Sequence, residues 1–281
     1  MLVAKPAGPT SHDVVDVVRR ALQIRRVGHL GTLDPFAAGL LVLVVGRATR
    51  LAPFAAEWTK DYTGVIRLGT VTATDDATGA VVETSEEWRT LDRDRIAAVL
   101  AEFRGAYDQR PPAFSAVKVD GERAYRRARR GEQVALDVRR VEIHELTLMD
   151  LAPPDVGFRA AVTAGTYLRS LARDVGERLG CGAHLAALTR SRVGPFRVED
   201  AVGPAAVTPH VVRDPAVLVV DLPRRELDEE ERGLVLHGRS VEAGRGTGDG
   251  GRVALFFQGC LVAVAERVGD ALKPRLVLAE A

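Results

Sequence analysis

The sequence predicts an α+β fold with a small β-rich appendage at its C-terminal end. Three observations support this prediction. Strand-like runs follow one another at 138–151 and 156–163, helical patterns are scattered among the strands, and strand-like runs gather again at 252–257 and 260–266. Regular alternation of strands and helices would instead indicate a doubly wound parallel sheet.

Composition restricts the class of protein. The chain has 281 residues, of which 46% are hydrophobic and 27% charged, which excludes a mainly disordered chain. No apolar run approaches the roughly 20 residues of a membrane helix. Cys181 and Cys260 are too few and too far apart for a disulfide framework or a CxxC metal site. Because Met1 leads almost directly into Lys5 without a signal-peptide core, we expect a cytoplasmic protein without a membrane partner.

The first third of the chain predicts a helix, a glycine-rich loop and strands. Ser11 can cap a helix over 12–23, and a loop with three glycines follows at 26–39. The apolar run 40–45 fits either the end of a short helix or a buried strand, which periodicity does not separate. Residues 62–68 predict a strand that continues past Gly69 towards Thr74, and a turn follows at 75–79.

The rest of the chain is predicted from similar patterns. A helix is expected over 91–103, with Gly105 able to terminate it. The strands 138–151 and 156–163 are joined by Pro153 and Pro154, and a helix over 167–179 ends before Gly180. Composition shifts at 222–231, which places a boundary between residues 1–222 and 223–281, and a glycine-rich turn at 244–251 separates the last strand-like runs.

Charge is unevenly distributed, although the net charge is only +1. Residues 104–130 contain eight Lys or Arg side chains against three acids, whereas residues 75–94 contain seven acids against two arginines. The basic segment also holds Tyr107, Phe114 and Tyr125. Basic and aromatic side chains together favour binding of a nucleic acid, whose phosphates pair with the charges and whose bases stack on the rings. The alternative is that the basic segment is the solvent-exposed face of a helix.

The loop at 26–39 holds the strongest candidates for chemistry. Asp34 lies in a glycine-bounded loop beside Pro35, where the alternative to catalysis is a turn-capping role. His29 could serve as an acid or base, a metal ligand or a loop hydrogen-bonder. The histidines form no HxH or HxxxH pair, and the phosphate-loop, nucleophile-elbow and dinucleotide-binding motifs are missing from the sequence. Arg169 lies at the start of its helix, where its positive charge is unfavourable beside the positive end of the helix dipole. A nearby carboxylate such as Asp34 would offset this charge.

Together these segments resemble the TruB family of tRNA pseudouridine synthases. Residues 5–11 are similar to its opening motif, and 28–39 with 46–49 to its catalytic motif. The blocks at 60–62, 67–69, 110–121, 165–171 and 182–196 continue the resemblance in order, with 110–121 similar to the RNA-gripping thumb. Phe114 stands where members commonly have Tyr, and 162–164 replace a lead-in that usually contains Cys and Ser. Residues 272–274 resemble the end of a PUA-type RNA-binding domain.

The resemblance implies a fold and a reaction. The fold is a mixed, largely antiparallel sheet flanked by helices, with a catalytic cleft across it. Residues 1–222 would form the catalytic domain, with a thumb-like basic insertion over about 106–135, and 223–281 a small PUA-like domain. The reaction isomerises uridine 55 in the T arm of tRNA to pseudouridine after base flipping, by a monomer that uses no cofactor and no metal.

The family pattern also implies the roles of individual residues. Asp34 is the essential carboxylate, which attacks the sugar, attacks the base or assists elimination to a glycal. Arg169 pairs with Asp34, and Tyr62 stacks on the flipped base and moves a proton. His29 fills the RNA loop, and Tyr167 is a further substrate contact. Phosphates would be bound by Lys5, Lys118, Arg126, Arg127 and Arg130.

Three other functions stay open at this point. The chain could be a non-catalytic tRNA-binding or tRNA-folding protein, although such a protein has no use for Asp34, Tyr62 and Arg169 together. It could be a guide-RNA-dependent pseudouridine synthase subunit, which shares these motifs. A metal-dependent phosphoesterase using His29 and Asp34 would fail in a chelator. Pseudouridine formation by the purified protein on bare tRNA in a chelator would therefore argue against all three.

Overall fold

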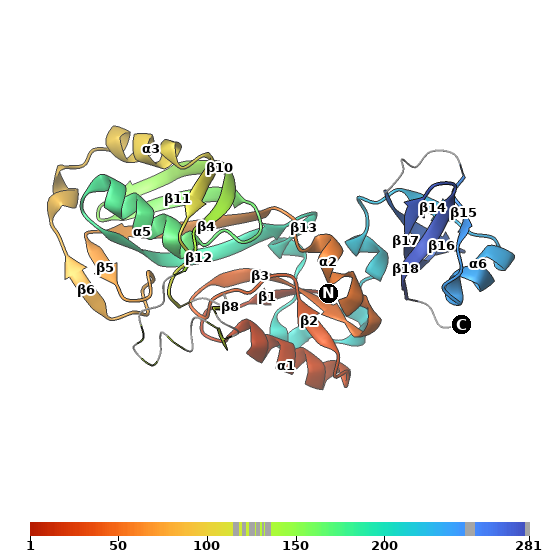
Figure 1. The fold of residues 1–281 in the computed structure, drawn as a ribbon. Helices are drawn as coiled ribbons and strands as arrows, with labels where there is room; N and C mark the ends of the chain where they lie inside the picture. Colours follow the sequence, from red (N-terminus) through yellow and green to blue (C-terminus); the bar gives the residue numbers. More distant parts are fainter. Residues whose placement is uncertain are drawn as a thin grey trace.

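The computed structural model describes residues 1–114, 118–119, 122–123, 127, 130, 132, 136–244 and 251–278. A large mixed sheet forms the centre of the bigger part of the molecule (Figure 1). Its strands lie in the order β1 (Leu2–Lys5), β3 (Ala38–Val45), β12 (Ala183–Val193), β4 (Lys60–Leu68), β11 (Asp155–Val162), β10 (Arg139–Ala152) and β7 (Gly105–Gln109). Strand β2 (Val27–His29) pairs with β3, and β13 (Phe196–Arg197) pairs with β12.

Pairing in this sheet is antiparallel except between β3 and β12, where Thr189 and Arg190 lie opposite Ala38 and Gly39 in parallel. The predicted α+β class and the mixed, largely antiparallel sheet are therefore confirmed. Strands β10 and β11 lie where the sequence predicts them. Strand β12 was given no secondary structure in the sequence analysis, although it lies between β3 and β4.

The apolar run at 40–45 is a strand, and both of its faces are covered. Leu41 and Leu43 belong to the core beneath the helices, whereas Leu40, Val42 and Val44 belong to a second core on the opposite face. A strand buried on both faces shows an uninterrupted apolar run rather than alternation. This burial explains why periodicity alone did not separate a helix from a strand.

Helices α1 (Ser11–Leu22), α3 (Arg93–Glu102) and α5 (Leu168–Leu179) pack their apolar sides into one core with the sheet, and short α2 (Ala52–Ala55) packs against the other core. Thr10, rather than the predicted Ser11, caps α1, because Thr10 and Asp13 form a capping box. The Ser11 hydroxyl instead donates to the Leu33 carbonyl and accepts from the Leu33 amide. Gly180 ends α5 as predicted, at a φ of +79°.

The strand predicted to pass Gly69 changes sheet at that residue. Gly69 has a φ of +76°, and β5 (Thr70–Thr72) leaves β4 to pair with β6 (Val81–Thr84). The predicted turn at 75–79 joins these two strands, with hydrogen bonds from the Asp75 amide to the Thr72 carbonyl and from the Gly79 amide to the Asp76 carbonyl. Two further short strands, β8 (Lys118–Val119) and β9 (Glu122–Arg123), pair with each other.

The C-terminal part holds a second sheet, shown in blue in Figure 1. Its order is β14 (Arg224–Glu226), β16 (Arg252–Phe257), β17 (Cys260–Val268), β18 (Ala271–Val277) and β15 (Val241–Glu242). The predicted strand-like runs correspond to β16 and β17. The acidic stretch after residue 226 forms helix α6 (Glu229–Leu236), which begins with a capping box of Asp228 and Glu231.

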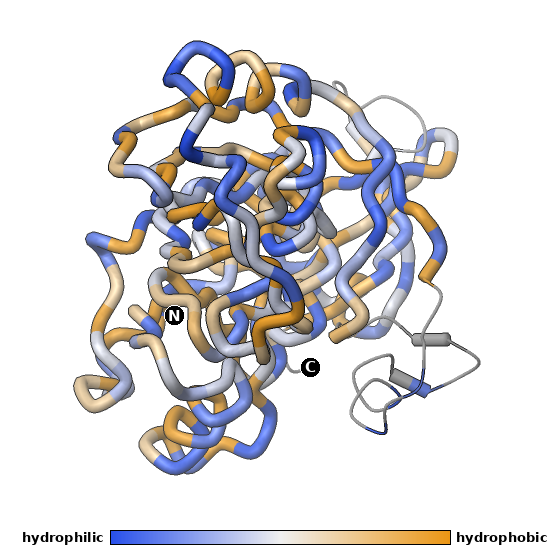
Figure 2. The backbone as a smooth tube through the Cα atoms, turned by 90° about the vertical axis from the view of Figure 1, so that its left-hand side faces the viewer, coloured by the Kyte–Doolittle hydropathy of each residue, from blue (hydrophilic) through white to orange (hydrophobic). Residues whose placement is uncertain are grey.

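The two sheets share an apolar core. Along β16, Val253 and Leu255 face the C-terminal core, whereas Ala254 and Phe256 face the core that also contains Leu2, Val42 and Val44. Two arginines add polar contacts between the parts: Arg47 donates to the Leu278 carbonyl (3.0 Å) and Arg50 to the Val277 carbonyl (2.7 Å). Apolar and polar stretches alternate along the chain (Figure 2), and none of the described helices is long and apolar enough to cross a membrane.

Candidate active site

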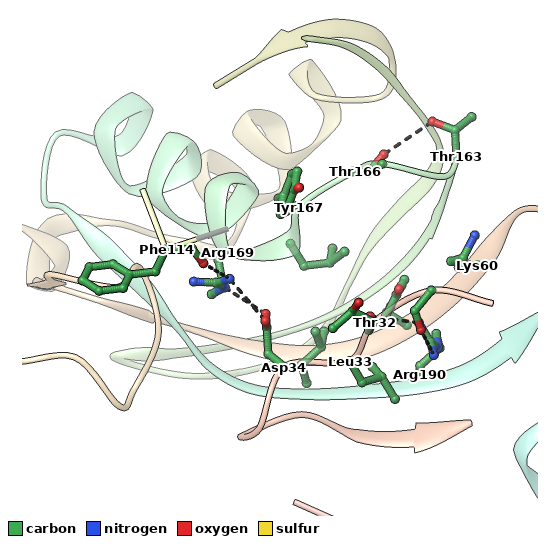
Figure 3. Close-up of a pocket in the computed structure, with 15 residues that line it drawn as sticks. Thr32, Leu33, Asp34, Lys60, Phe114, Thr163, Thr166, Tyr167, Arg169 and Arg190 are labelled. Carbon is green, nitrogen blue, oxygen red and sulfur yellow. Dashed lines mark hydrogen bonds and ion pairs between the residues drawn. The ribbon is translucent and has the colours of Figure 1, made fainter. Parts of the chain in front are cut away.

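The predicted loop at 26–39 is a loop only over residues 30–37, because β2 and β3 form its two ends. A pocket of about 250 Å³ opens where this loop meets β4, β12 and the start of α5. The loop contributes residues 31–34, and the segment before and within α5 contributes residues from Thr163 to Arg169. Of the predicted catalytic and substrate-binding residues, Asp34, Tyr62, Tyr167 and Arg169 line it. Figure 3 shows Asp34, Arg169 and Phe114 at one end of the pocket and Lys60 and Arg190 at the other.

Asp34 and Arg169 form a bidentate ion pair across the pocket (Figure 3). Arg169 Nε donates to Asp34 Oδ2 over 2.9 Å, and Nη2 donates to Oδ1 over 3.2 Å. The Arg169 side chain is 6% exposed, whereas that of Asp34 is 34% exposed and so accessible to a substrate. The predicted pairing is confirmed, and the carboxylate offsets the unfavourable placement of a cation at the start of α5.

Further groups hold the Arg169 guanidinium in place. It donates to the Thr74 carbonyl (3.0 Å) and the Phe114 carbonyl (2.9 Å), and it lies 3.6 Å from a carboxylate oxygen of Asp76. Asp76 is buried and accepts hydrogen bonds from the side chains of Thr74 and Thr78. Asp76 was not a candidate site residue, because the sequence around it predicts an ordinary turn.

Two buried cations fix the backbone of the loop at 30–37. Arg190, which is 0% exposed, donates to the carbonyls of Gly31 (3.1 Å), Thr32 (3.4 Å) and Leu40 (2.7 Å). Lys5, which is 1% exposed, donates to the carbonyls of Pro6, Pro9 and Pro35 at 2.8–3.2 Å. The ammonium of Lys5 therefore has backbone carbonyls beside Asp34 as its partners, and the phosphate contact of Lys5 stays a prediction.

Lys60 and Tyr62 extend into the pocket from the first residues of β4. Tyr62 is buried and lines the same pocket as Asp34. Lys60 donates to the carbonyls of Trp58 (2.8 Å) and Ala56 (3.4 Å). Burial, together with the nearby Arg190 charge, lowers the pKa of Lys60 to about 8. Lys60 belongs to the block at 60–62 that resembles the family, and no role was predicted for it from the sequence.

Tyr167 caps α5 and is held from outside the helix. No side chain of the helix caps this end, but the buried Gln109 at the end of β7 hydrogen-bonds both the amide and the carbonyl of Tyr167. Neither Gln109 nor Arg190 was a candidate in the sequence analysis. The bonds that bring these two side chains to the site go to backbone carbonyls and an amide, which no residue pattern encodes.

His29 lies in β2 and is outside the residues that line the pocket. Burial lowers the pKa of its imidazole, and the charges of Arg190 and His12 lower it further. The ring is therefore neutral at pH 7. Among the described residues, no three His, Cys, Asp or Glu side chains gather as metal ligands would.

The predicted basic segment is described only in part. The Lys118 side chain and Arg126 lie outside the described residues. Arg130 forms a bidentate pair with Glu122 (2.7 and 2.9 Å) and a further bond to Glu132, to which Arg127 also donates (2.9 Å). A phosphate that bound Arg127 or Arg130 would therefore have to displace a glutamate carboxylate from that arginine.

Comparison with known proteins gives a consistent result. Residues 19–168 match the model of the TruB family pseudouridylate synthase N-terminal domain, and residues 169–221 match that of the tRNA pseudouridylate synthase B C-terminal domain. The tRNA pseudouridine synthase B of Thermobifida fusca (strain YX) is 45% identical, covering 99% of this chain and 98% of its own. That of Arthrobacter sp. (strain FB24) is 42% identical over 99% and 96%. A chain in the crystal structure of a Cbf5-Nop10-Gar1 complex superposes with a TM-score of 0.73 at 26% identity, covering 99% of this chain and 85% of that one.

Proposed function

Because the chain belongs to the TruB family of pseudouridylate synthases, we propose that it isomerises uridine 55 in the T arm of tRNA, with Asp34 as the catalytic carboxylate. The coarser activity, tRNA pseudouridine synthesis by an isomerase, follows from relatives that match along their full length. The observation that carries the assignment of Asp34 is its bidentate pair with the buried Arg169 at the wall of the pocket.

The proposed reaction moves the glycosidic bond of uridine from nitrogen to carbon without adding a group. Asp34 presents an accessible carboxylate to the flipped nucleotide, and Arg169 orients that carboxylate and offsets its charge. Tyr62 supplies an aromatic face for the extruded base, which offsets part of the few kcal/mol that unstacking costs. Tyr167, which also lines the pocket, is proposed as a second substrate contact.

The RNA outside the pocket would be held mainly by charge. We propose phosphate contacts for Lys118, Arg126, Arg127 and Arg130, and a place in the RNA loop for His29. Residues 1–222 would act as the catalytic domain, with the insertion at about 106–135 as its thumb, and 223–281 as a PUA-like RNA-binding domain. The enzyme would work as a cytoplasmic monomer without metal or cofactor.

The test is carbodiimide primer extension on an unmodified tRNA transcript incubated with purified protein in a chelator. We expect one new stop, at position 55, which is missing with Asp34→Asn although that variant still binds tRNA. A stop at another position would overturn the proposed site specificity. No stop from the wild-type protein, despite tight tRNA binding, would favour a guide-dependent subunit or a non-catalytic binder. Loss of tRNA binding by folded Asp34→Asn would contradict the role given to Asp34.

A further inference from the structure

The side-chain amide of Gln109 clamps the backbone of Tyr167. Gln109 Nε2 donates to the Tyr167 carbonyl over 3.1 Å, and the Tyr167 amide donates to Gln109 Oε1 over 2.8 Å. The two residues are 58 positions apart, and Gln109 is 1% exposed. A primary amide that pairs with both polar groups of one residue fixes that residue in the way a strand neighbour would.

The backbone of Tyr167 determines which way the amide faces, and a third contact fits that orientation. Gln109 Nε2 also donates to the hydroxyl of Tyr107, which lies two residues earlier in β7 and so on the same face of the strand. Turning the amide over would place an oxygen against the Tyr167 carbonyl and an N–H against the Tyr167 amide. Only one orientation therefore satisfies all three contacts.

The clamp acts at the residue that starts α5. Tyr167 is the N-cap, its side chain caps no amide of the helix, and its carbonyl accepts the first helical hydrogen bond from the Leu171 amide (3.1 Å). Arg169 lies in this first turn, with its guanidinium shared between Asp34 and the Phe114 carbonyl. Ser170 and Arg173 of the same helix both donate to the Arg110 carbonyl, next to Gln109.

We propose that Gln109 is a positioning residue for the reaction, because it sets the first turn of α5 and thereby the aim of Arg169 at Asp34. This inference rests on the proposed function. Gln109 does not line the pocket, so its loss should act through the placement of Arg169 and Tyr167, while the charged contacts proposed to hold most of the tRNA stay intact. A small misplacement of a reacting pair can cost on the order of 10²-fold in rate.

The test compares Gln109→Met and Gln109→Glu with Asp108→Asn, a control at the neighbouring exposed residue of β7. Met keeps the length of the side chain and removes all three hydrogen bonds. We expect kcat on tRNA to fall by about tenfold to 100-fold in Gln109→Met, with KM within about twofold of wild type. An unchanged kcat, an effect confined to KM, or an equal loss in Asp108→Asn overturns the proposal.

The carboxyl introduced by Gln109→Glu gives a readout that general loss of structure would not produce. When protonated, it accepts from the Tyr167 amide and donates to the Tyr167 carbonyl, whereas the ionised form repels that carbonyl. Burial raises the pKa of such a carboxyl towards neutrality. The ratio of variant to wild-type kcat should therefore be higher at pH 6 than at pH 9. A ratio that is constant over this range overturns the proposal, even if Gln109→Met does not fold.

Hydrogen exchange separates this proposal from the proposed function. Amides at 167–172 should exchange faster in Gln109→Met than in wild type and be unchanged in Asp108→Asn. If wild type forms no pseudouridine, the proposed function fails while this measurement still tests the clamp. Unchanged exchange at 167–172 in Gln109→Met overturns the clamp whatever the activity.

Discussion

At the scale of single residues, Lys60 carries a titratable charge that the fold stabilises poorly. Burial and Arg190 lower its pKa to about 8, whereas the unfolded chain binds that proton up to about pH 10.4. Between these values the unfolded state holds more protons, so the free energy of unfolding rises with pH. Urea denaturation should show wild type gaining about 2 kcal/mol more than Lys60→Met between pH 7.5 and pH 9.5.

The control for this measurement is Lys273→Met, at an exposed lysine of β18. Its gain in stability over the same pH range should equal that of wild type. If Lys60→Met also equals wild type, the buried ammonium does not titrate in this range.

Residue type predicts some of the site residues and gives no information on the others. Asp34 and Arg169 were predicted to pair because a cation at a helix start needs a carboxylate nearby. The carbonyl partners of Lys5 were not predicted, since a lysine in a motif gives no information on which main-chain groups receive its hydrogen bonds. Gln109 and Arg190 were missed because their partners are main-chain groups of distant segments.

At the scale of elements, the contact between β3 and β12 depends on a glycine. Gly39 has a φ of +105°, and a Cβ added to it would lie 2.2 Å from the Arg190 carbonyl oxygen. Gly39→Ala therefore combines backbone strain with a clash against a strand that cannot move aside. We expect urea unfolding to show a loss of at least about 3 kcal/mol.

Gly203→Ala is the matched control for this substitution. Gly203 has a φ of −63°, and its added Cβ meets no atom within 4 Å, so its stability should change by less than about 1 kcal/mol. A similar effect of the two substitutions would show that the close approach of β3 and β12 is not a constraint.

Elements were predicted well where burial leaves a periodic pattern. Helix α5, strands β10 and β11, and the strands β16 and β17 all have such patterns, and each lies within a few residues of its predicted range. Strand β12 was missed because Arg190 and Arg192 interrupt its apolar positions, one buried on carbonyls and one paired with Asp61. The groups that stabilise these two charges lie far away in the sequence, so the local pattern does not show that a strand can hold them.

At the scale of the whole molecule, the two sheets should unfold together because they share a core. Ala254 faces that shared core from β16 and is 1% exposed. Ala254→Asp would bury a carboxylate between the two parts, which destabilises their contact more than either part alone. Calorimetry should show one transition for wild type and two for Ala254→Asp.

The control is Val268→Asp, which places the same side chain at an exposed position of the C-terminal sheet, at the end of β17. It should preserve the single transition. Two transitions in the wild-type protein would mean that the shared core does not couple the parts.

The position of β12 has a consequence for how the protein becomes active during its synthesis. In the described part of the chain, β12 is the strand that links β1 and β3 to β4, β11, β10 and β7, and its Arg190 holds the carbonyls beside Asp34. A ribosome delivers the Asp34 loop and Tyr62 long before it delivers β12. The nascent chain therefore carries its carboxylate without the strand that fixes it, and uridine isomerisation has to wait until residue 193 has left the exit tunnel.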